Sequence, residues 1–212
     1  MSKRRRKNHR GYTAVEVLVA MTLFAIGAAG VIGMQRATVQ GGEDARRLDT
    51  GTNIANEWVG RLQRDATQWT QPSALNPTTN NINLTRWVQQ VNTAACNPPA
   101  FCTPQPDPAT PQGFSYAFDI FGRDLDPATN KATYCVQYRM WWGRPPGNAP
   151  FNEEMAVNAD VRVFWSRLEQ APIGNCKTPT VQGKGPDDPN APLYYHFVRV
   201  STVLRRTQES PQ

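Results

Sequence analysis

The chain has 212 residues, of which 39% are apolar, so it can bury one ordinary core but is short for two domains. Its formal net charge of +6 suggests an acidic partner such as nucleic acid, but six of the 23 basic residues lie within the first eleven positions. The rest of the chain has equal numbers of basic and acidic residues, and this neutral body argues against nucleic acid as a partner.

The first 35 residues combine a basic start with an uncharged apolar run. Residues 1–11 carry the basic cluster, and residues 17–35 are nineteen positions without a charge, about the length that a helix needs to cross a hydrocarbon layer. We therefore predict a basic leader over residues 1–11 and a transmembrane helix over residues 12–35. The leader would hold the N-terminus in the cytoplasm, so the chain after Arg36 is expected on the other side of the membrane.

Glu16 stands at the head of the apolar run, where an unpaired carboxylate is costly if it enters the bilayer. An ordinary secretory signal peptide, cleaved among the small residues 25–29, has the same basic start and apolar run but no need of this acid. Cleavage between Gly11 and Tyr12 would instead place a new α-amino group one helical turn from Glu16. The positive end of the helix dipole would lie there too.

The string from Arg10 to Glu16, RGYTAVE, followed by the apolar helix, resembles the class III leader of type IV prepilins and type II secretion pseudopilins. The resemblance implies that a prepilin peptidase cleaves between Gly11 and Tyr12 and methylates the amine of Tyr12. It also implies that Glu16 guides assembly by pairing with the terminal amine of a neighbouring subunit. The protein is then expected in the inner membrane, with its body in the periplasm until assembly.

Beyond the membrane we predict that the helix continues over residues 36–68. Its expected buried stripe has alternating spacings of three and four, and the opposite side, which includes Arg61, is expected to face solvent or another subunit. The stripe consists of Ala45, Leu48, Thr52, Ala55, Val59, Leu62 and Ala66. Residues 69–112 are rich in proline and are predicted to form a connecting loop, with a short helix near residues 84–91.

Residues 113–206 change to the period of two that is typical of strands. A first strand is expected around residues 114–120, a second over residues 134–142, a third around residues 161–165 and a fourth over residues 194–204. Turn-rich stretches between them favour antiparallel connections, and residues 207–212 form a tail. The expected fold class is α+β: a long N-terminal helix packed on a four-stranded antiparallel sheet, which is also the pilin fold.

Four cysteines follow the apolar run, at Cys96, Cys102, Cys135 and Cys176, without C-x-x-C spacing. Two disulfides in an oxidising compartment fit this pattern better than four reduced thiols or a zinc site. Three pairings are possible. We expect Cys96 to pair with Cys102, which closes a tight loop that contains proline, and Cys135 to pair with Cys176, because these two bracket the third strand.

No arrangement of residues typical of catalysis is present in the sequence, so we expect a protein that is not an enzyme and needs no cofactor or metal. His196 lies in a predicted strand and is interpreted as structural. Asp124, Asp126 and Asn130 lack the glycine and the closing glutamate of a calcium loop, and are interpreted as a polar turn.

Within the family, several stretches are similar to minor pilins of the PilV type. Gly33 stands where major pilins usually carry a proline, and the four cysteines differ from their single C-terminal disulfide loop.

The resemblance implies a role in initiating pilus assembly and in the pilus tip, in motility and adhesion. The implied partners are other minor pilins, the major pilin, a tip adhesin and the inner-membrane assembly platform. A minor pseudopilin of type II secretion, or a module for DNA uptake or adhesive binding, is the alternative. The similar stretches are EVLVA (16–20), AIG (25–27), GMQ (33–35), ANE (55–57) and RL (61–62).

Overall fold

The structure, a computed structural model, describes residues 13–69, 81–106, 115–126, 131–143, 156–168 and 172–205. The chain divides into two compact units, Met1–Arg46 and Arg47–Gln212. The expected leader, the cleavage site at Gly11 and Tyr12, and the expected tail lie outside the described residues.

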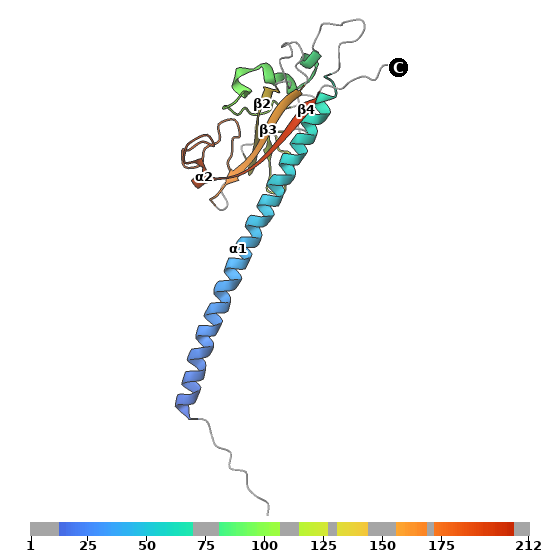
Figure 1. Cartoon of the computed structure of the whole chain (residues 1–212). Helices are drawn as coiled ribbons and strands as arrows, with labels where there is room; N and C mark the ends of the chain where they lie inside the picture. Colours follow the sequence, from blue (N-terminus) through green and yellow to red (C-terminus); the bar gives the residue numbers. More distant parts are fainter. Residues whose placement is uncertain are drawn as a thin grey trace, which may run out of the picture. The chain divides into compact units, whose positions relative to one another are not determined.

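The first helix, α1, runs without interruption from Ala14 to Ala66 (Figure 1). It begins after Thr13, whose carbonyl oxygen accepts hydrogen bonds from the N–H groups of Glu16 and Val17. No proline removes a backbone donor along these 53 residues. After Ala66 the backbone tightens, and the N–H of Trp69 donates to the carbonyl oxygen of Ala66 in the manner of a 3₁₀ turn.

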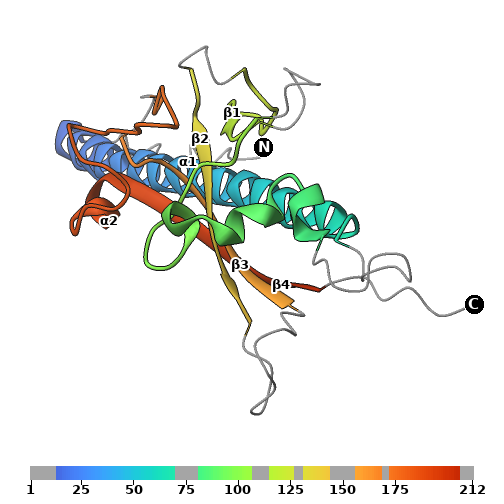
Figure 2. The same ribbon diagram turned by 90° about the horizontal axis from the view of Figure 1, so that it is seen from above.

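The sheet contains four strands within the described residues: β1 (Ala117–Phe118), β2 (Tyr134–Trp142), β3 (Ala156–Ser166) and β4 (Tyr195–Arg205). Every neighbouring pair is antiparallel, and the strand order follows the chain. Figures 1 and 2 show β2, β3 and β4 beside the C-terminal part of α1. The structure therefore confirms the predicted α+β arrangement of a long N-terminal helix on a four-stranded antiparallel sheet.

One part of the core lies between the second half of α1 and the sheet, and a second buried layer lies on the opposite face, where Phe164 packs against Tyr195. At the centre of the first part the ring of Trp58 lies 6.4 Å from that of Tyr138 in β2. Gly51 permits a close approach, because a Cβ there would lie 2.7 Å from the ring of Trp165 in β3. The buried residues of the helix are Gly51, Ile54, Ala55, Trp58, Arg61, Leu62, Asp65 and Ala66.

The predicted stripe of α1 was partly wrong. Ala55, Leu62 and Ala66 are buried, but Ala45 is exposed and Leu48 is 51% exposed. The large side chains of Ile54 and Trp58 face the sheet instead, since they bury more apolar surface than the smaller residues of the predicted stripe. The interpretation of Arg61 as solvent-facing was also wrong, since it is 2% exposed.

The first strand is shorter than predicted. β1 ends at Phe118 because the chain turns at Asp119, whose carboxylate accepts hydrogen bonds from the N–H groups of Phe121 and Arg123. Gly122 adopts a φ of +76° in this turn, a conformation that favours glycine. Ile120, predicted to lie in the strand, is 53% exposed in the turn.

The described part of the predicted loop contains three short 3₁₀ helices: η1 (Asn81–Leu84), η2 (Val88–Asn92) and η3 (Ala94–Cys96). The Asp65 carboxylate, from the end of α1, accepts hydrogen bonds from the N–H groups of Arg86, Trp87 and Val88 at 2.7–2.9 Å. It thus satisfies donors at the start of η2 and ties this region to the helix. A four-residue helix, α2 (Ala191–Tyr194), precedes β4.

Candidate membrane anchor and assembly site

The N-terminal part of α1 is an apolar helix with no covering partner in the described part of the unit Met1–Arg46. Its most apolar window of 18 residues has a mean hydropathy of 2.3, and none of that window is buried. Phe24 is 79% exposed and Met34 is 75% exposed. Among the described residues, α1 is long and apolar enough to cross a membrane, although a signal sequence meets the same test.

Glu16 lies in the first turn of α1 and is exposed. Together with Val17, Ala20, Met21 and Phe24 it lines a shallow depression on the helix surface, so a carboxylate borders an otherwise apolar strip. Helix N-termini carry a partial positive charge, which favours an acid at this position. Within the described residues Glu16 forms no ion pair. Gly11 and Tyr12 lie outside them, so cleavage, methylation and pairing with the terminal amine stay predictions.

Two disulfides stabilise the second unit. Cys96 pairs with Cys102 across a separation of six residues, and Cys135 pairs with Cys176 across 41 residues. These are the pairs expected from the sequence. The first connects η3 to a residue that bridges β2 at Tyr138, and the second connects β2 to the segment before β4.

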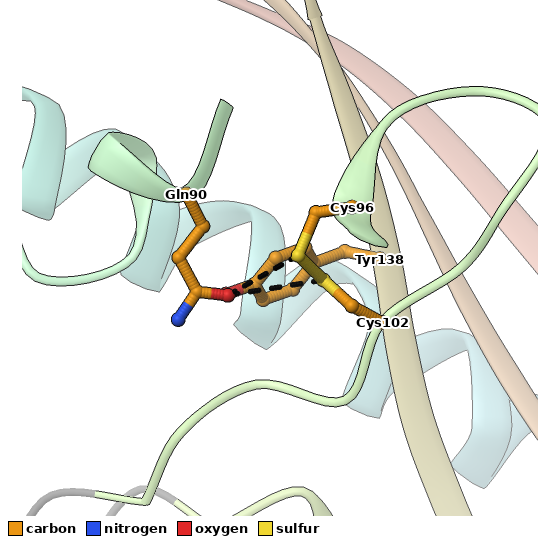
Figure 3. Close-up of a disulfide and its surroundings, with 4 residues drawn as sticks. All are labelled: Gln90, Cys96, Cys102 and Tyr138. Atoms are coloured by element: carbon orange, nitrogen blue, oxygen red, sulfur yellow. Dashed lines mark hydrogen bonds between the residues drawn. A yellow bond between two sulfur atoms is a disulfide. The ribbon is translucent and has the colours of Figure 1, made fainter. Parts of the chain in front are cut away.

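A partly buried polar contact accompanies the first disulfide (Figure 3). The hydroxyl of Tyr138 donates to Oε1 of Gln90 at 2.9 Å, and the same oxygen lies 3.3 Å from Sγ of Cys96. Burial is the main cause that raises the pKa of Tyr138, and the charge of Asp65 raises it further. Nothing in the sequence indicated this role of Gln90, because its hydrogen-bond donor Tyr138 lies 48 residues further along the chain.

Two of the polar residues considered for chemistry, His196 and Asp124, have structural contacts. His196 stacks on the ring of Trp165, with ring centroids 5.4 Å apart. Asp124 forms an ion pair with Arg61 at 2.7 Å, which the sequence did not indicate because the partners are 63 residues apart. Among the described residues, no group of three or more His, Cys, Asp or Glu side chains could hold a metal ion.

Residues 6–32 match the family model of the prokaryotic N-terminal methylation motif. The match covers the expected cleavage site, Glu16 and most of the exposed apolar helix. No curated protein and no solved structure shows significant similarity to the chain. The motif and the apolar N-terminal helix fit a membrane-anchored, single-pass protein. The chain therefore carries the N-terminal motif of type IV pilin-like proteins, a group that includes pilins and pseudopilins and acts in pilus or secretion machinery.

Proposed function

We propose that the chain is a minor pilin that helps to initiate assembly of a type IV pilus and forms part of its tip. One observation carries this proposal: the described part of the methylation motif, residues 13–32, lies at the exposed apolar start of the same helix whose second half is buried on the sheet. Such a helix needs lipid before assembly and can pack against other apolar helices after it. A filament subunit is surrounded by lipid before assembly and by the apolar helices of other subunits after it.

In this proposal a prepilin peptidase cleaves between Gly11 and Tyr12 and methylates the amine of Tyr12. The N-terminus enters the membrane from the cytoplasm, and the disulfide-bonded body folds in the periplasm, where disulfides form and persist. Other minor pilins, the major pilin, a tip adhesin and the inner-membrane assembly platform are the proposed partners.

The assignment to a minor rather than a major subunit rests on two features that differ from typical major pilins. The apolar section has glycine at Gly33 where those subunits usually have proline. The body has two disulfides rather than a single C-terminal loop. A minor pseudopilin of type II secretion would share the methylation motif, so the machinery that copurifies with the protein is the discriminating observation.

The first prediction concerns processing. Mass spectrometry of the protein from its own membranes should find a mature chain that starts at N-methylated Tyr12, and sheared pili should contain it at low abundance. A mature N-terminus within residues 25–30 would instead indicate a secretory signal peptide and overturn the proposal. A correctly processed chain that copurifies only with secretion components would assign it to the pseudopilins.

A further inference from the structure

Three arginines surround the ring of Phe101, and we refer to these four residues as the arginine cluster. The guanidinium carbon of Arg162 lies 3.9 Å from the ring centroid, that of Arg139 lies 4.7 Å away and that of Arg199 lies 5.6 Å away. Each distance is within the range of a cation–π contact. One aromatic ring therefore holds three cations from three neighbouring strands close together.

The arginine cluster lies on the sheet face that points away from α1. Tyr138 contacts Trp58 of the helix, and because side chains alternate along a strand, Arg139 points to the opposite face. Arg162 and Arg199 are direct partners across β3 and β4, so they share that face. The cluster is therefore outside the core that holds helix and sheet together.

Two of the three arginines have a carboxylate partner. Arg139 donates from Nε and Nη2 to one Asp160 oxygen at 2.9 and 2.8 Å. Arg162 pairs with Asp187 at 2.7 Å. Arg199 is exposed, and in the part of the chain that the structure describes it forms no ion pair. The arginine cluster thus has one more positive charge than it has acidic partners.

The electrostatics favour a further anion. Burial is the main cause that lowers the pKa of Arg162, and the positive charges of Arg199 and Arg139 lower it further, against the opposing effect of Asp187. An additional carboxylate beside Arg199 would reduce this repulsion. Guanidinium groups that contact a ring keep N–H groups available at their edges, and those edges match the two oxygens of a carboxylate.

We propose that the arginine cluster is a docking site for an acidic side chain, Asp or Glu, of a neighbouring subunit, with Arg199 as its main contact. The site already accepts this chemistry, since Asp187 reaches Arg162 although its own side chain is 66% exposed. A nucleic acid is a poorer match, because the chain beyond the leader has no excess of positive charge for a row of phosphates. This proposal rests on the proposed function as a filament subunit.

Zero-length cross-linking of the full chain in its own membranes tests the proposal. Arg199→Lys keeps the charge and introduces an amine that a carbodiimide can couple to a carboxylate in direct contact. Arg205→Lys, an exposed arginine further along β4, is the matched control. We expect a cross-link from position 199 to Asp or Glu of another subunit and none from position 205. Cross-links only within the chain, or equal cross-linking at both positions, would overturn the proposal.

Charge reversal provides a second readout. Arg199→Glu should lower the recovery of copurifying subunits by about tenfold, whereas Arg205→Glu should not. Equal recovery with both variants, or a loss confined to nucleic-acid binding, would contradict a protein partner. The mature N-terminus is measured in the same samples. Normal processing with failed cross-linking rejects only the docking site, while failed processing rejects the proposed function.

Discussion

The guanidinium of Arg61 lies 5.0 Å from the ring centroid of Trp58 and 5.7 Å from that of Phe118. It pairs with Asp124, whose side chain is 18% exposed, and with Glu57, whose side chain is 46% exposed. A cation as buried as this requires its counter-ions, since removal of one partner from a buried pair is far more costly than loss of a surface pair. The two carboxylates should therefore contribute unequally to stability.

We predict that Asp124→Asn lowers the free energy of unfolding by about 3 kcal/mol, because it leaves most of the buried charge of Arg61 without compensation. Glu57→Gln, the matched control on the more exposed partner, should lower it by less than about 1 kcal/mol. Urea unfolding of the detergent-solubilised full chain, followed by tryptophan fluorescence, measures both values. Equal effects of the two variants would contradict the unequal roles.

The hydroxyl of Tyr138 leads to a prediction for alkaline pH. Tyrosines in the unfolded chain ionise near pH 10, but burial raises the pKa of Tyr138 well above that value, so the folded state keeps the proton longer. Stability is then fully present below pH 10 and falls as pH rises above it, by about 1.4 kcal/mol per pH unit for this group. Tyr138→Phe should reduce that slope, as measured by urea unfolding between pH 8 and 11.5. An unchanged slope would contradict this origin.

The positions of β2 and β4 were predictable from the sequence. In β2 apolar residues recur at every second position from Tyr134 to Trp142, and the strand has the predicted bounds, whereas β4 is shifted by one residue from the predicted range 194–204. The helix face and β1 were less predictable, because they depend on contacts between distant residues. The face of α1 that is buried is determined by the contact of Trp58 with Tyr138 of β2. β1 ends where the Asp119 carboxylate accepts a hydrogen bond from the N–H of Phe121 in a turn.

The candidate site was predictable to a similar degree. The leader string and Glu16 resemble a type IV pilin-like leader by local pattern alone, and the matched methylation motif covers the same stretch. The contacts of Arg61 with Asp124, of Gln90 with Tyr138 and of Asp65 with the start of η2 were not predictable, because they join residues 21 to 63 positions apart in the chain. Charge and residue type indicate that a residue needs a partner, but the fold determines which one it has.

The two disulfides should differ in their effect on stability. On the chain-entropy model, a closed loop of 41 residues contributes roughly 4 kcal/mol and one of six residues roughly 2 kcal/mol. Cys176→Ser should therefore destabilise the protein more than Cys102→Ser does in the same urea experiment. Peptide mapping without reduction should find both native pairs in the unmodified chain, and any cross-pairing would contradict them.

The two units differ in burial along the described part of the chain, because residues 13–46 of the first contribute no buried residue and the second contains the core. The described part of Met1–Arg46 is an exposed apolar helix, whereas the buried residues of α1 begin at Gly51. Stability therefore resides in the sheet unit, and substitutions near the start of α1 should leave the fold of the body intact. This separation allows the role of Glu16 to be tested without unfolding the body.

Glu16 is exposed at the N-terminal end of α1, close to the expected cytoplasmic boundary of the membrane. Before assembly, water and lipid headgroups there can solvate its carboxylate. In the proposed filament that solvent would be lost, and the carboxylate would need an amine, either its own or, as the resemblance to prepilins implies, that of Tyr12 in a neighbouring subunit. Such a pair need not add net stability, since desolvation offsets the attraction, but it can favour one axial register.

We therefore predict that Glu16→Ala leaves membrane insertion and cleavage after Gly11 largely unchanged but removes the protein from sheared filaments and from its complex with partner subunits. Glu43→Ala is the matched control, because Glu43 is also exposed on α1 but lies beyond the apolar section. Immunoblots of membrane and sheared fractions, with mass spectrometry of the N-terminus, separate loss of assembly from loss of processing. Normal copurification and piliation in a strain carrying only Glu16→Ala would show that the carboxylate is dispensable. A subunit at the very tip has no neighbour above it, so its Glu16 or its amine could stay unpaired there without stopping growth.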